Sequence, residues 1–336
     1  MRFKSCEHKL LILIIVITLN SLMIVGCDKS TPQKLENLRF GVGMQPSSIL
    51  TFVAQEKGFF KQQGLDIELI RFPSGKRALY DGLFKGKVDA VTSSATPFVI
   101  ASFKHTDMAI IATLFEANNV NRIIARRDSG ITQPKDLKGR KIATQKNSAV
   151  HFFMHLFLLE NGLSENDMSV SFYKAEKLPE TLVSGEIDAF SMREPFIGQA
   201  KRMLGENAII FDAPGAYRQI ELLVLSRELL KTRPLVAQAL LRALLQAEKF
   251  LRDEPDSAIS IIAMALKSMP ESVSASLQDS ISHVTLEQSL ISLLEDQANW
   301  ARTNKIVDAK SIPNYLNFID TKPLEKVNPA MMTLVH

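Results

Sequence analysis

Leu83-Phe84-Lys85-Gly86-Lys87-Val88-Asp89-Ala90 recurs in the second half of the chain as Leu182-Val183-Ser184-Gly185-Glu186-Ile187-Asp188-Ala189. In each copy a helical pattern ends at a glycine, which adopts the left-handed conformation without a Cβ clash. The strands that follow, 88–91 and 187–192, are apolar apart from one early acid, as in a sheet covered on both faces. The repeat is consistent with two lobes of similar build, or with one αβ loop that any α/β protein can use twice.

The segments around the two copies alternate between strand and helix patterns. We expect strands at 38–44, 65–72, 88–91, 108–115, 121–127, 170–173, 187–192 and 208–211, a second βα series that opens at 136–143, and helices at 47–63, 75–85, 97–105, 149–160 and 178–184. Such alternation with short loops indicates parallel sheets built from βαβ units. The extended segment 219–225 is interpreted as a crossing back to the first series.

After residue 233 the chain is predicted to be helical, at 236–252, 255–267, 272–279 and 286–302. Leu, Ile and Ala recur there at i, i+3 and i+4, so these helices have a core-facing stripe and are expected to pack on the first lobe. The predicted fold class is α/β, with two Rossmann-like lobes joined by two crossing segments. Lobe 1 comprises 38–122 and 222–336, and lobe 2 comprises 123–221. The cleft between them is expected at the C-terminal ends of parallel strands.

The N-terminus has the pattern of a signal peptide. Arg2, Lys4 and Lys9 precede an apolar run that ends in Ile24-Val25-Gly26-Cys27. The final four residues resemble a bacterial lipobox, so residues 1–26 are predicted to be removed, Cys27 to be lipidated and 27–37 to form a tether. This places the protein on the periplasmic side of the inner membrane, or on the outer surface of a Gram-positive cell. The alternative is ordinary secretory cleavage next to a chance cysteine.

Charge and cysteine content exclude several function classes. The net charge is +4, and removal of residues 1–26 takes away three basic residues and one acid, which leaves +2. Without a Lys/Arg cluster this balance argues against a nucleic-acid partner. Cys6 leaves with the signal and Cys27 is blocked by lipid. We therefore expect no disulfide, no thiol nucleophile and no cysteine metal site.

Several motifs, taken in order, resemble those of one family of extracytoplasmic solute-binding proteins. They are Ala54-x3-Gly58-Phe59-Phe60-x3-Gly64-Leu65, the two glycine–aspartate repeats, Asp136-Leu137-Lys138-Gly139-x-Lys141-Ile142-Ala143 and Glu194-Pro195. The chain resembles the nitrate/sulfonate/taurine/thiamine-precursor binders of ABC importers over roughly 38–302. The resemblance implies a type II periplasmic binding fold, a small-molecule ligand, permease subunits as partners and a monomer.

The local match is to aliphatic-sulfonate binders, whose oxyanion loop is similar to Lys141-Ile-Ala-Thr-Gln-Lys-Asn-Ser-Ala-Val-His151. Asn147 replaces a glycine of that loop, and Ala149 and Val150 replace two serines. These replacements remove two hydroxyl donors. Arg193 stands where those binders have an aromatic residue before the acid–proline step.

Three predicted helices begin at the cleft, after Gln45-Pro46-Ser47, after Ser93-Ser94 and after Asn147-Ser148. Free N–H groups at helix starts suit anions or carbonyl oxygens, although Ser94, Thr96 and Ser148 can instead cap their own helices. The full set of candidate ligand contacts is Gln45, Ser47, Ser93, Ser94, Thr144, Asn147, Ser148, His151, Arg193, Glu194 and Tyr217.

The chemistry of the charged and aromatic candidates leaves the ligand's charge open. Arg193 can clamp an oxyanion through two hydrogen bonds, and Glu194 can accept from an amine or aminopyrimidine, or both can form surface ion pairs. Tyr217 can stack on a flat ligand or pack the hinge. His151 and His155 have metal-compatible spacing but no evident third ligand, so no metal or other cofactor is expected.

Three functions are compatible with these features. The first is a binding protein for import of a small organic anion or pyrimidine-type solute, which needs no catalytic group. The second is a biosynthetic enzyme on the same fold, and the third is a sensor that presents its ligand-closed form to a receptor. We find no Ser-His-Asp order, phosphate-binding loop or metal cluster, so a non-enzymatic binder is favoured.

Overall fold

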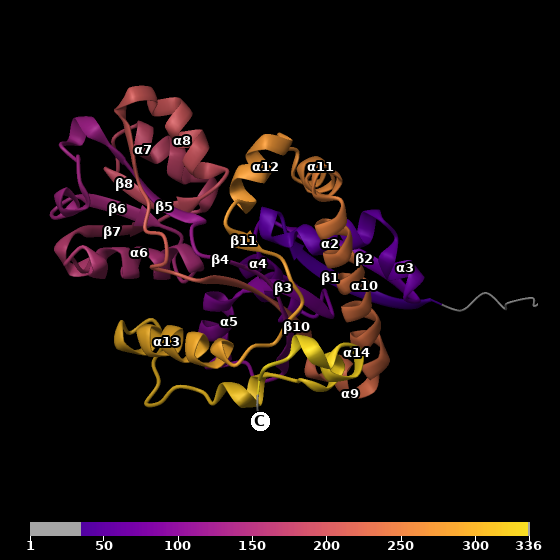
Figure 1. The fold of residues 1–336 in the computed structure, drawn as a ribbon. Coiled ribbons are helices and arrows are strands. Elements are labelled where there is room, and N and C mark those ends of the chain that lie inside the picture. Colours follow the sequence, from indigo (N-terminus) through magenta and orange to yellow (C-terminus); the bar gives the residue numbers. More distant parts are fainter. Residues whose placement is uncertain (1–34, 335–336) are drawn as a thin grey trace, which may run out of the picture. The chain divides into compact units, whose positions relative to one another are not determined.

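The computed structural model describes residues 35–334, which form two β-sheets with helices packed on them (Figure 1). The first sheet has the strand order β11-β4-β10-β3-β1-β2, and the second has the order β7-β6-β8-β5-β9. The strands of the first sheet are β1 (Glu36–Gly43), β2 (Leu65–Phe72), β3 (Ala90–Ser94), β4 (Met108–Ala117), β10 (Gln219–Ser226) and β11 (Ser280–Ile281). Those of the second are β5 (Asn121–Arg126), β6 (Lys141–Thr144), β7 (Ser169–Phe172), β8 (Ala189–Arg193) and β9 (Ala208–Phe211). This architecture confirms the predicted α/β fold class.

The helices follow the strands in βα order. They include α2 (Ile49–Glu56), α3 (Phe59–Gln62), α4 (Gly75–Arg77), the π-helical η2 (Ala78–Leu83), α5 (Ala95–Ser102), α6 (Ala149–Glu160), α7 (Leu178–Val183) and α8 (Phe196–Leu204). The C-terminal part adds α9 (Arg227–Thr232), α10 (Pro234–Asp253), α11 (Pro255–Leu266), α12 (Pro270–Leu277), α13 (Ser289–Thr303) and α14 (Lys322–Val327). The predicted single helix 47–63 is wrong, because Gly58 has a φ of 70° and separates α2 from α3.

The two repeat copies have the same backbone hydrogen bonds. Gly86 and Gly185 have φ values of 64° and 78°. Asp89 donates its N–H to the carbonyl of Arg39 and accepts the N–H of Arg39 at its carboxylate. Asp188 makes the same two bonds with Lys141. Each acid therefore fixes the entry of its strand beside a parallel neighbour, which is β1 for β3 and β6 for β8.

The segment 219–225 is more than the crossing predicted from the sequence. It forms β10, which pairs antiparallel with both β3 and β4 inside the first sheet. The second sheet is also mixed, since β5 is antiparallel to β8 and β9. The expectation of parallel sheets therefore holds for β2–β1–β3 and β7–β6–β8 and not for the other pairs. The apolar run Leu222–Leu225 is buried, which suits an interior strand.

The start of the chain is only partly described. The predicted signal segment 1–26 and Cys27 lie outside the described residues, as does most of the predicted tether. Glu36 and Asn37, which were assigned to the tether, belong to β1 and pair with β2. Among residues 35–334 no helix is both long and apolar enough to span a bilayer.

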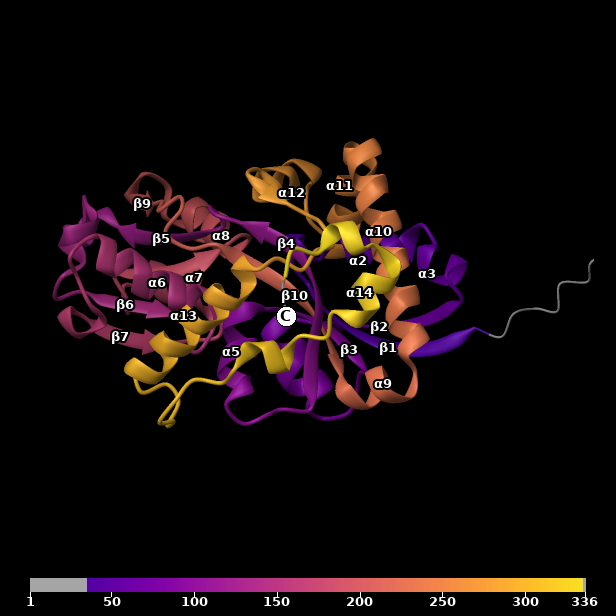
Figure 2. The same cartoon turned by 60° about the horizontal axis from the view of Figure 1, so that its bottom comes forward.

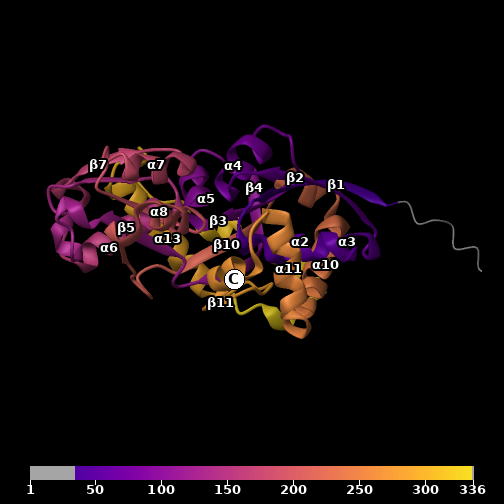
Figure 3. The same ribbon diagram turned by 90° about the horizontal axis from the view of Figure 1, so that it is seen from above.

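The C-terminal helices contribute to the hydrophobic core of the first sheet and to one of the two core clusters of the second. Figure 3 shows α10 and α11 beside α2 and α3, and residues from α10 and α11 join the core of the first sheet. Helix α13, seen in Figure 2 beside α5 and α6, begins in that same core with Leu290 and Leu294. Trp300, near its end, packs in the core of the second sheet with Phe152 and Tyr217. The prediction of packing on lobe 1 thus holds for α10 and α11, while α13 contacts both cores.

Candidate ligand-binding site

A small cavity of about 30 Å³ lies where the two sheets meet at the C-terminal ends of β1, β4 and β8. This is the edge where the sequence predicts a cleft. It is lined by Gln45, Pro46, Ser47, Phe115, Asn119, Val120, Arg122, Arg193, Glu194, Gln219, Ala275 and Ser276. A volume of this size holds about one water molecule. An organic ligand therefore requires the lining to move apart.

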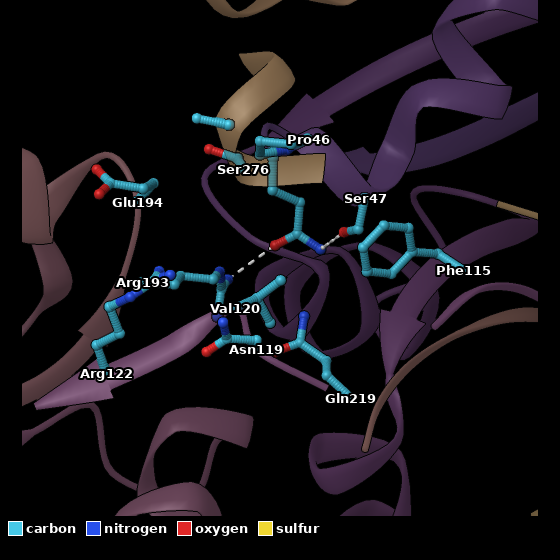
Figure 4. A pocket seen from close by; sticks show the side chains of 12 residues that line it. Pro46, Ser47, Phe115, Asn119, Val120, Arg122, Arg193, Glu194, Gln219 and Ser276 are labelled. Atoms are coloured by element: carbon cyan, nitrogen blue, oxygen red, sulfur yellow. Dashed lines mark hydrogen bonds between the residues drawn. The ribbon is translucent and has the colours of Figure 1, made fainter. Parts of the chain in front are cut away.

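The cavity is crossed by a hydrogen bond from Arg193 to Gln45. Arg193 ends β8 of the second sheet, and its Nη2 donates to Oε1 of Gln45 at 2.8 Å (Figure 4). Gln45 follows β1 of the first sheet and donates its own Nε2 to the Ser47 hydroxyl at 2.9 Å. Burial lowers the pKa of Arg193, while the nearby acid Glu221 raises it. The guanidinium presents more donors than the single amide oxygen can use, so it can bind an oxyanion.

Glu221 is a fully buried acid in β10, beside this cavity. Its side chain is 0% exposed, and neither carboxylate oxygen has a hydrogen-bond partner among the residues that the structure describes. A Cβ atom on Gly75 would lie 2.8 Å from Oε1, so the carboxylate packs directly against the Gly75 backbone. Burial raises the pKa of Glu221 to about 8, and the charge of Arg193 opposes this rise. Sequence analysis missed Glu221, although a lone acid in the apolar run Gln219–Ser226 was a visible signal.

A second contact between the two sheets' loops involves Lys76. Its Nζ donates to the backbone carbonyl of Lys146, in the loop before α6, at 2.6 Å. Burial is the main cause that lowers the pKa of Lys76 to about 8, and the charges of Arg77 and Lys146 add to it. With the bond between Arg193 and Gln45, this contact holds the loops of the two sheets together.

The predicted polar residues are only partly brought together. Gln45, Ser47, Arg193 and Glu194 line the cavity. Glu194 also accepts the N–H of Gly198 at 3.0 Å, near the start of α8. Glu194 therefore both bonds to the start of α8 and lines the cavity.

The predicted serines at the helix starts are buried but do not line the cavity. Ser93 donates to the carbonyl of Ser94, and Ser148 donates to the carbonyl of Gln145 at 2.6 Å. The side chains of Ser94 and Ser148 do not cap α5 or α6. Ser94 pairs with Glu221 across the β3–β10 ladder, which puts it next to the buried acid.

Thr144 and Asn147 have structural roles here. Thr144 is buried and donates to the carbonyl of Ser191, which joins β6 to β8. Asn147 has a φ of 56°. Asparagine tolerates this left-handed conformation better than most residues, so it can replace the glycine of the similar sulfonate loop.

His151 is engaged by protein groups at both ring nitrogens. Nδ1 accepts the N–H of Asn147 at 3.3 Å, and Nε2 lies 3.2 Å from Glu165, so Nε2 carries the proton. His155 lies 3.8 Å from the other oxygen of Glu165, and burial lowers its pKa. Both ring nitrogens thus face protein groups, and donation from His151 to a ligand stays a prediction. Among residues 35–334 no group of three or more His, Cys, Asp or Glu residues could hold a metal ion.

Tyr217 faces a different hollow. Its hydroxyl lies 3.4 Å from that of Thr96, and its ring meets Phe152 edge-on with centroids 5.5 Å apart. It lines an open hollow of about 530 Å³ between α6 and α13, together with Trp300. Burial raises the pKa of Tyr217. These are packing contacts, and the two roles predicted for Tyr217, stacking on a flat ligand or packing at a hinge, stay predictions.

Several cavity residues carried no signal in the sequence. Phe115 belongs to β4, Asn119 and Val120 connect β4 to β5, Arg122 belongs to β5, Gln219 begins β10, and Ala275 and Ser276 belong to α12. Their approach depends on long-range pairing of β10 and on the placement of α12. Local patterns do not encode either of these.

Comparison with known proteins identifies the family. Residues 45–258 match the model of the family described as NMT1/THI5 like. A putative aliphatic sulfonates-binding protein of Bacillus subtilis (strain 168) is 28% identical over 192 residues, which cover 55% of this chain and 57% of that protein. A protein of the same description in Escherichia coli (strain K12) is 22% identical over 287 residues, covering 84% and 88%. The chain thus spans little more than half of the Bacillus protein and most of the Escherichia one.

The fold comparison agrees. The crystal structure of the periplasmic aliphatic sulphonate binding protein SsuA from Escherichia coli superposes with a TM-score of 0.72 and 19% identity. It covers 84% of this chain and 97% of that one. The family match extends over more than half of the sequence. The chain therefore belongs to the NMT1/THI5-like family and has the periplasmic binding protein fold.

Proposed function

We propose that this protein is the solute-binding component of an ABC importer, which captures a small organic anion and delivers it to a membrane permease. The observation that carries the proposal is the guanidinium of Arg193, buried at the cavity with the neutral amide of Gln45 as its hydrogen-bond acceptor. An oxyanion that displaced this amide would gain a charge-assisted, two-bond contact.

The relatives support an anion of the sulfonate type. Two are described as putative aliphatic sulfonates-binding proteins, and the crystallised SsuA is described as a periplasmic sulphonate binding protein. A pyrimidine-type solute is the second ligand class that we include, because the family is described as NMT1/THI5 like. Glu194, which lines the cavity, can accept from an amino group of such a ligand.

We further propose that the segments 38–122 and 222–336 move as one lobe and 123–221 as the other. Opening would break the contacts of Arg193 with Gln45 and of Lys76 with Lys146, and would expose Ser93, Ser94 and Ser148 to a ligand. In this proposal Cys27 anchors a monomer through lipid, on the periplasmic side of the inner membrane or on the outer surface of a Gram-positive cell. The anchor keeps the protein at high effective concentration near its permease.

A thermal-shift screen of the protein lacking residues 1–26 tests the proposal. The panel contains alkanesulfonates, carboxylates, nitrate, aminopyrimidines, sugars and peptides. A ligand at 100 times its dissociation constant adds about 2.7 kcal/mol to stability, so true ligands give a clear shift. Stabilisation by organic anions or pyrimidines supports the proposal, and stabilisation by sugars or peptides alone contradicts it. Turnover of a bound pyrimidine precursor would favour an enzyme instead, and a ligand-dependent complex with a receptor domain would favour a sensor.

A further inference from the structure

Four positively charged side chains gather where α9 and α14 lie beside α10 (Figure 1). Arg227, Lys231, Lys322 and Lys326 line a hollow of about 460 Å³ there, and Asp320 is the one acid among the described residues that line it. The cations come from two segments that are far apart in the sequence, so no local run of Lys and Arg indicates them. We call this surface the basic face.

The charges of the basic face are left largely uncompensated by the protein. Its three lysines are exposed, and none of them forms an ion pair within residues 35–334. Arg227 donates to two backbone carbonyls, which are neutral acceptors. Glu228 and Glu325 belong to the same helices but do not line the hollow. The basic face is therefore suited to a partner that carries several negative charges.

An exposed leucine adjoins the basic face. Leu235 follows Pro234, which lines the same hollow, and the Leu235 side chain is 70% exposed. Apolar side chains flanked by Lys and Arg are typical of surfaces that lie in the interface of a bilayer, because the apolar group enters the headgroup region while the cations meet anionic lipids. An anionic bilayer uses both features, whereas a dissolved phosphate ion would use only the charges.

The basic face lies close to the point where the first sheet continues toward the N-terminus. Arg233, which precedes Pro234, donates to the carboxylate of Glu36 at 2.9 Å and to the carbonyl of Asn37 at 2.6 Å. The proposed lipid on Cys27 is nine residues before Glu36, and nine residues span at most about 30 Å when fully extended. The basic face is thus within reach of the bilayer that such a lipid would enter.

We propose that the basic face rests on the anionic headgroups of the membrane that holds the lipid anchor. This inference rests on the proposed function, which supplies the anchor. It also assigns an orientation. Glu36 begins β1 and Gln45 follows its end, so the basic face and the cavity lie at opposite ends of a strand of eight residues, about 26 Å long. A protein that lies on this face has its cavity directed away from the bilayer.

Binding to vesicles tests the basic face apart from the anchor. The probe is the chain 27–336 without lipid, kept reduced, and the vesicles contain phosphatidylcholine alone or with about 40% phosphatidylglycerol. A cation near an anionic surface contributes about fivefold in affinity, so four cations give an association constant on the order of 10³ M⁻¹, and the lipid is used at millimolar concentration. Sedimentation should show binding to the anionic vesicles and little to the neutral ones. Binding should be lost at about 1 M salt, where the Debye length is about 3 Å.

Two matched variants locate the binding surface. The first carries three substitutions in the basic face, Lys231→Gln, Lys322→Gln and Lys326→Gln. It should bind the anionic vesicles about a hundredfold less tightly. The control removes the same charge from exposed lysines outside the basic face, Lys135→Gln, Lys174→Gln and Lys201→Gln, and should bind as the unaltered chain does. Both variants change only exposed side chains, and thermal unfolding checks that each remains folded.

The possible outcomes are separable. Binding that survives the first variant, an equal loss in both variants, equal binding to neutral vesicles, or no binding to anionic vesicles would each overturn the inference. Displacement by inorganic phosphate beyond that by chloride at the same ionic strength would assign the face to a dissolved phosphate and overturn it as well. The basic face has no part in ligand capture, so all of these results leave the proposed function standing. Failure of the ligand screen would overturn the proposed function and leave the vesicle result unchanged.

Discussion

Arg193 of the second sheet donates a hydrogen bond of 2.8 Å to Gln45 of the first. The bond joins two residues that line the cavity, one after β1 of the first sheet and one at the end of β8 of the second. One of the guanidinium N–H groups is therefore bonded to a neutral amide, and others remain available as donors. The anion that we propose as the ligand would compete with this amide for the same donors.

Replacement of Arg193 should weaken binding of any anionic ligand. We expect Arg193→Ala to cost at least ~1.5 kcal/mol of binding free energy, the low end for a hydrogen bond to a charged group. Arg193→Lys should bind the anion less tightly than wild type but more tightly than Arg193→Ala, because an ammonium keeps the charge but loses the planar fork. Isothermal titration measures the effect. Arg122→Ala is the control, since Arg122 lines the same cavity but is paired with Asp212; an equal loss in both variants would argue against a specific role for Arg193.

The raised pKa of Glu221 predicts a pH-dependent stability. The folded protein binds a proton at Glu221 up to about pH 8, whereas the unfolded chain releases it near the ordinary value of 4.5. The contribution of this group is fully present below pH 4.5 and is lost as the pH rises to about 8. Glu221→Gln should remove this loss, so the variant should become more stable than wild type by roughly 3 to 5 kcal/mol at pH 8. Urea unfolding across this range tests it, and parallel curves for the two proteins would contradict the assignment.

Gly75→Ala should destabilise the fold through a steric clash. The added methyl group would lie 2.8 Å from Oε1 of Glu221 and 3.0 Å from the Cα of Ser93. Overpacking of this kind costs about 1 to 3 kcal/mol. If Glu221 is the principal obstacle, combining Gly75→Ala with Glu221→Ala should recover part of the loss. Additive losses in the double variant, measured by urea unfolding, would instead assign the clash to the backbone of β3.

Gly86→Ala tests the conformational requirement of the repeat. Gly86 has a φ of 64°, and nothing lies within 4 Å of an added Cβ. The cost is therefore purely one of backbone conformation, about 1 kcal/mol, and Gly86→Asn should cost less because asparagine tolerates this region. Thermal unfolding of the two variants gives the comparison. A larger loss for asparagine than for alanine would refute the conformational explanation.

Trp300 is expected to stabilise the fold by packing rather than by hydrogen bonding. Its side chain is 5% exposed, and its Nε1 has no partner among the described residues. Trp300→Ala should cost about 3 to 5 kcal/mol, as for other large aromatic residues, whereas Trp300→Phe should cost less than about 1.5 kcal/mol. Chemical denaturation distinguishes the two. Similar losses in both variants would point to a hydrogen bond of the indole.

The local sequence pattern was sufficient to predict a helix or strand whose ends are marked by residues in the same stretch of sequence. The strand 65–72, the helix 149–160 and the strand 208–211 were predicted with the bounds that the structure shows. The first follows Gly64, which has a φ of 80°, and the second is followed by Gly162 at 71°. Such glycines end an element irrespective of what packs on it.

Features that depend on distant partners were predicted less well. The position of β10 between β3 and β4 is fixed by pairing across more than a hundred residues of sequence, and its pattern alone gives only an extended, apolar segment. The same holds for the cavity, which combines residues after β1, β4 and β8 with Ser276 of α12. Polar residues such as Thr144 and His151 were recognised by type, but their hydrogen bonds to Ser191 and Glu165 keep them inside the second sheet and its helix.

Helix α13 imposes a mechanical condition on any opening of the protein. Leu290 and Leu294 are embedded in one core and Trp300 in the other, within a single rigid rod of four turns. Separation of the sheets must therefore break the packing of one end of α13, either by sliding that end out of its core or by moving α13 with one sheet away from the other. In the proposed function, release of the ligand would then depend on the packing of Trp300, which does not line the cavity.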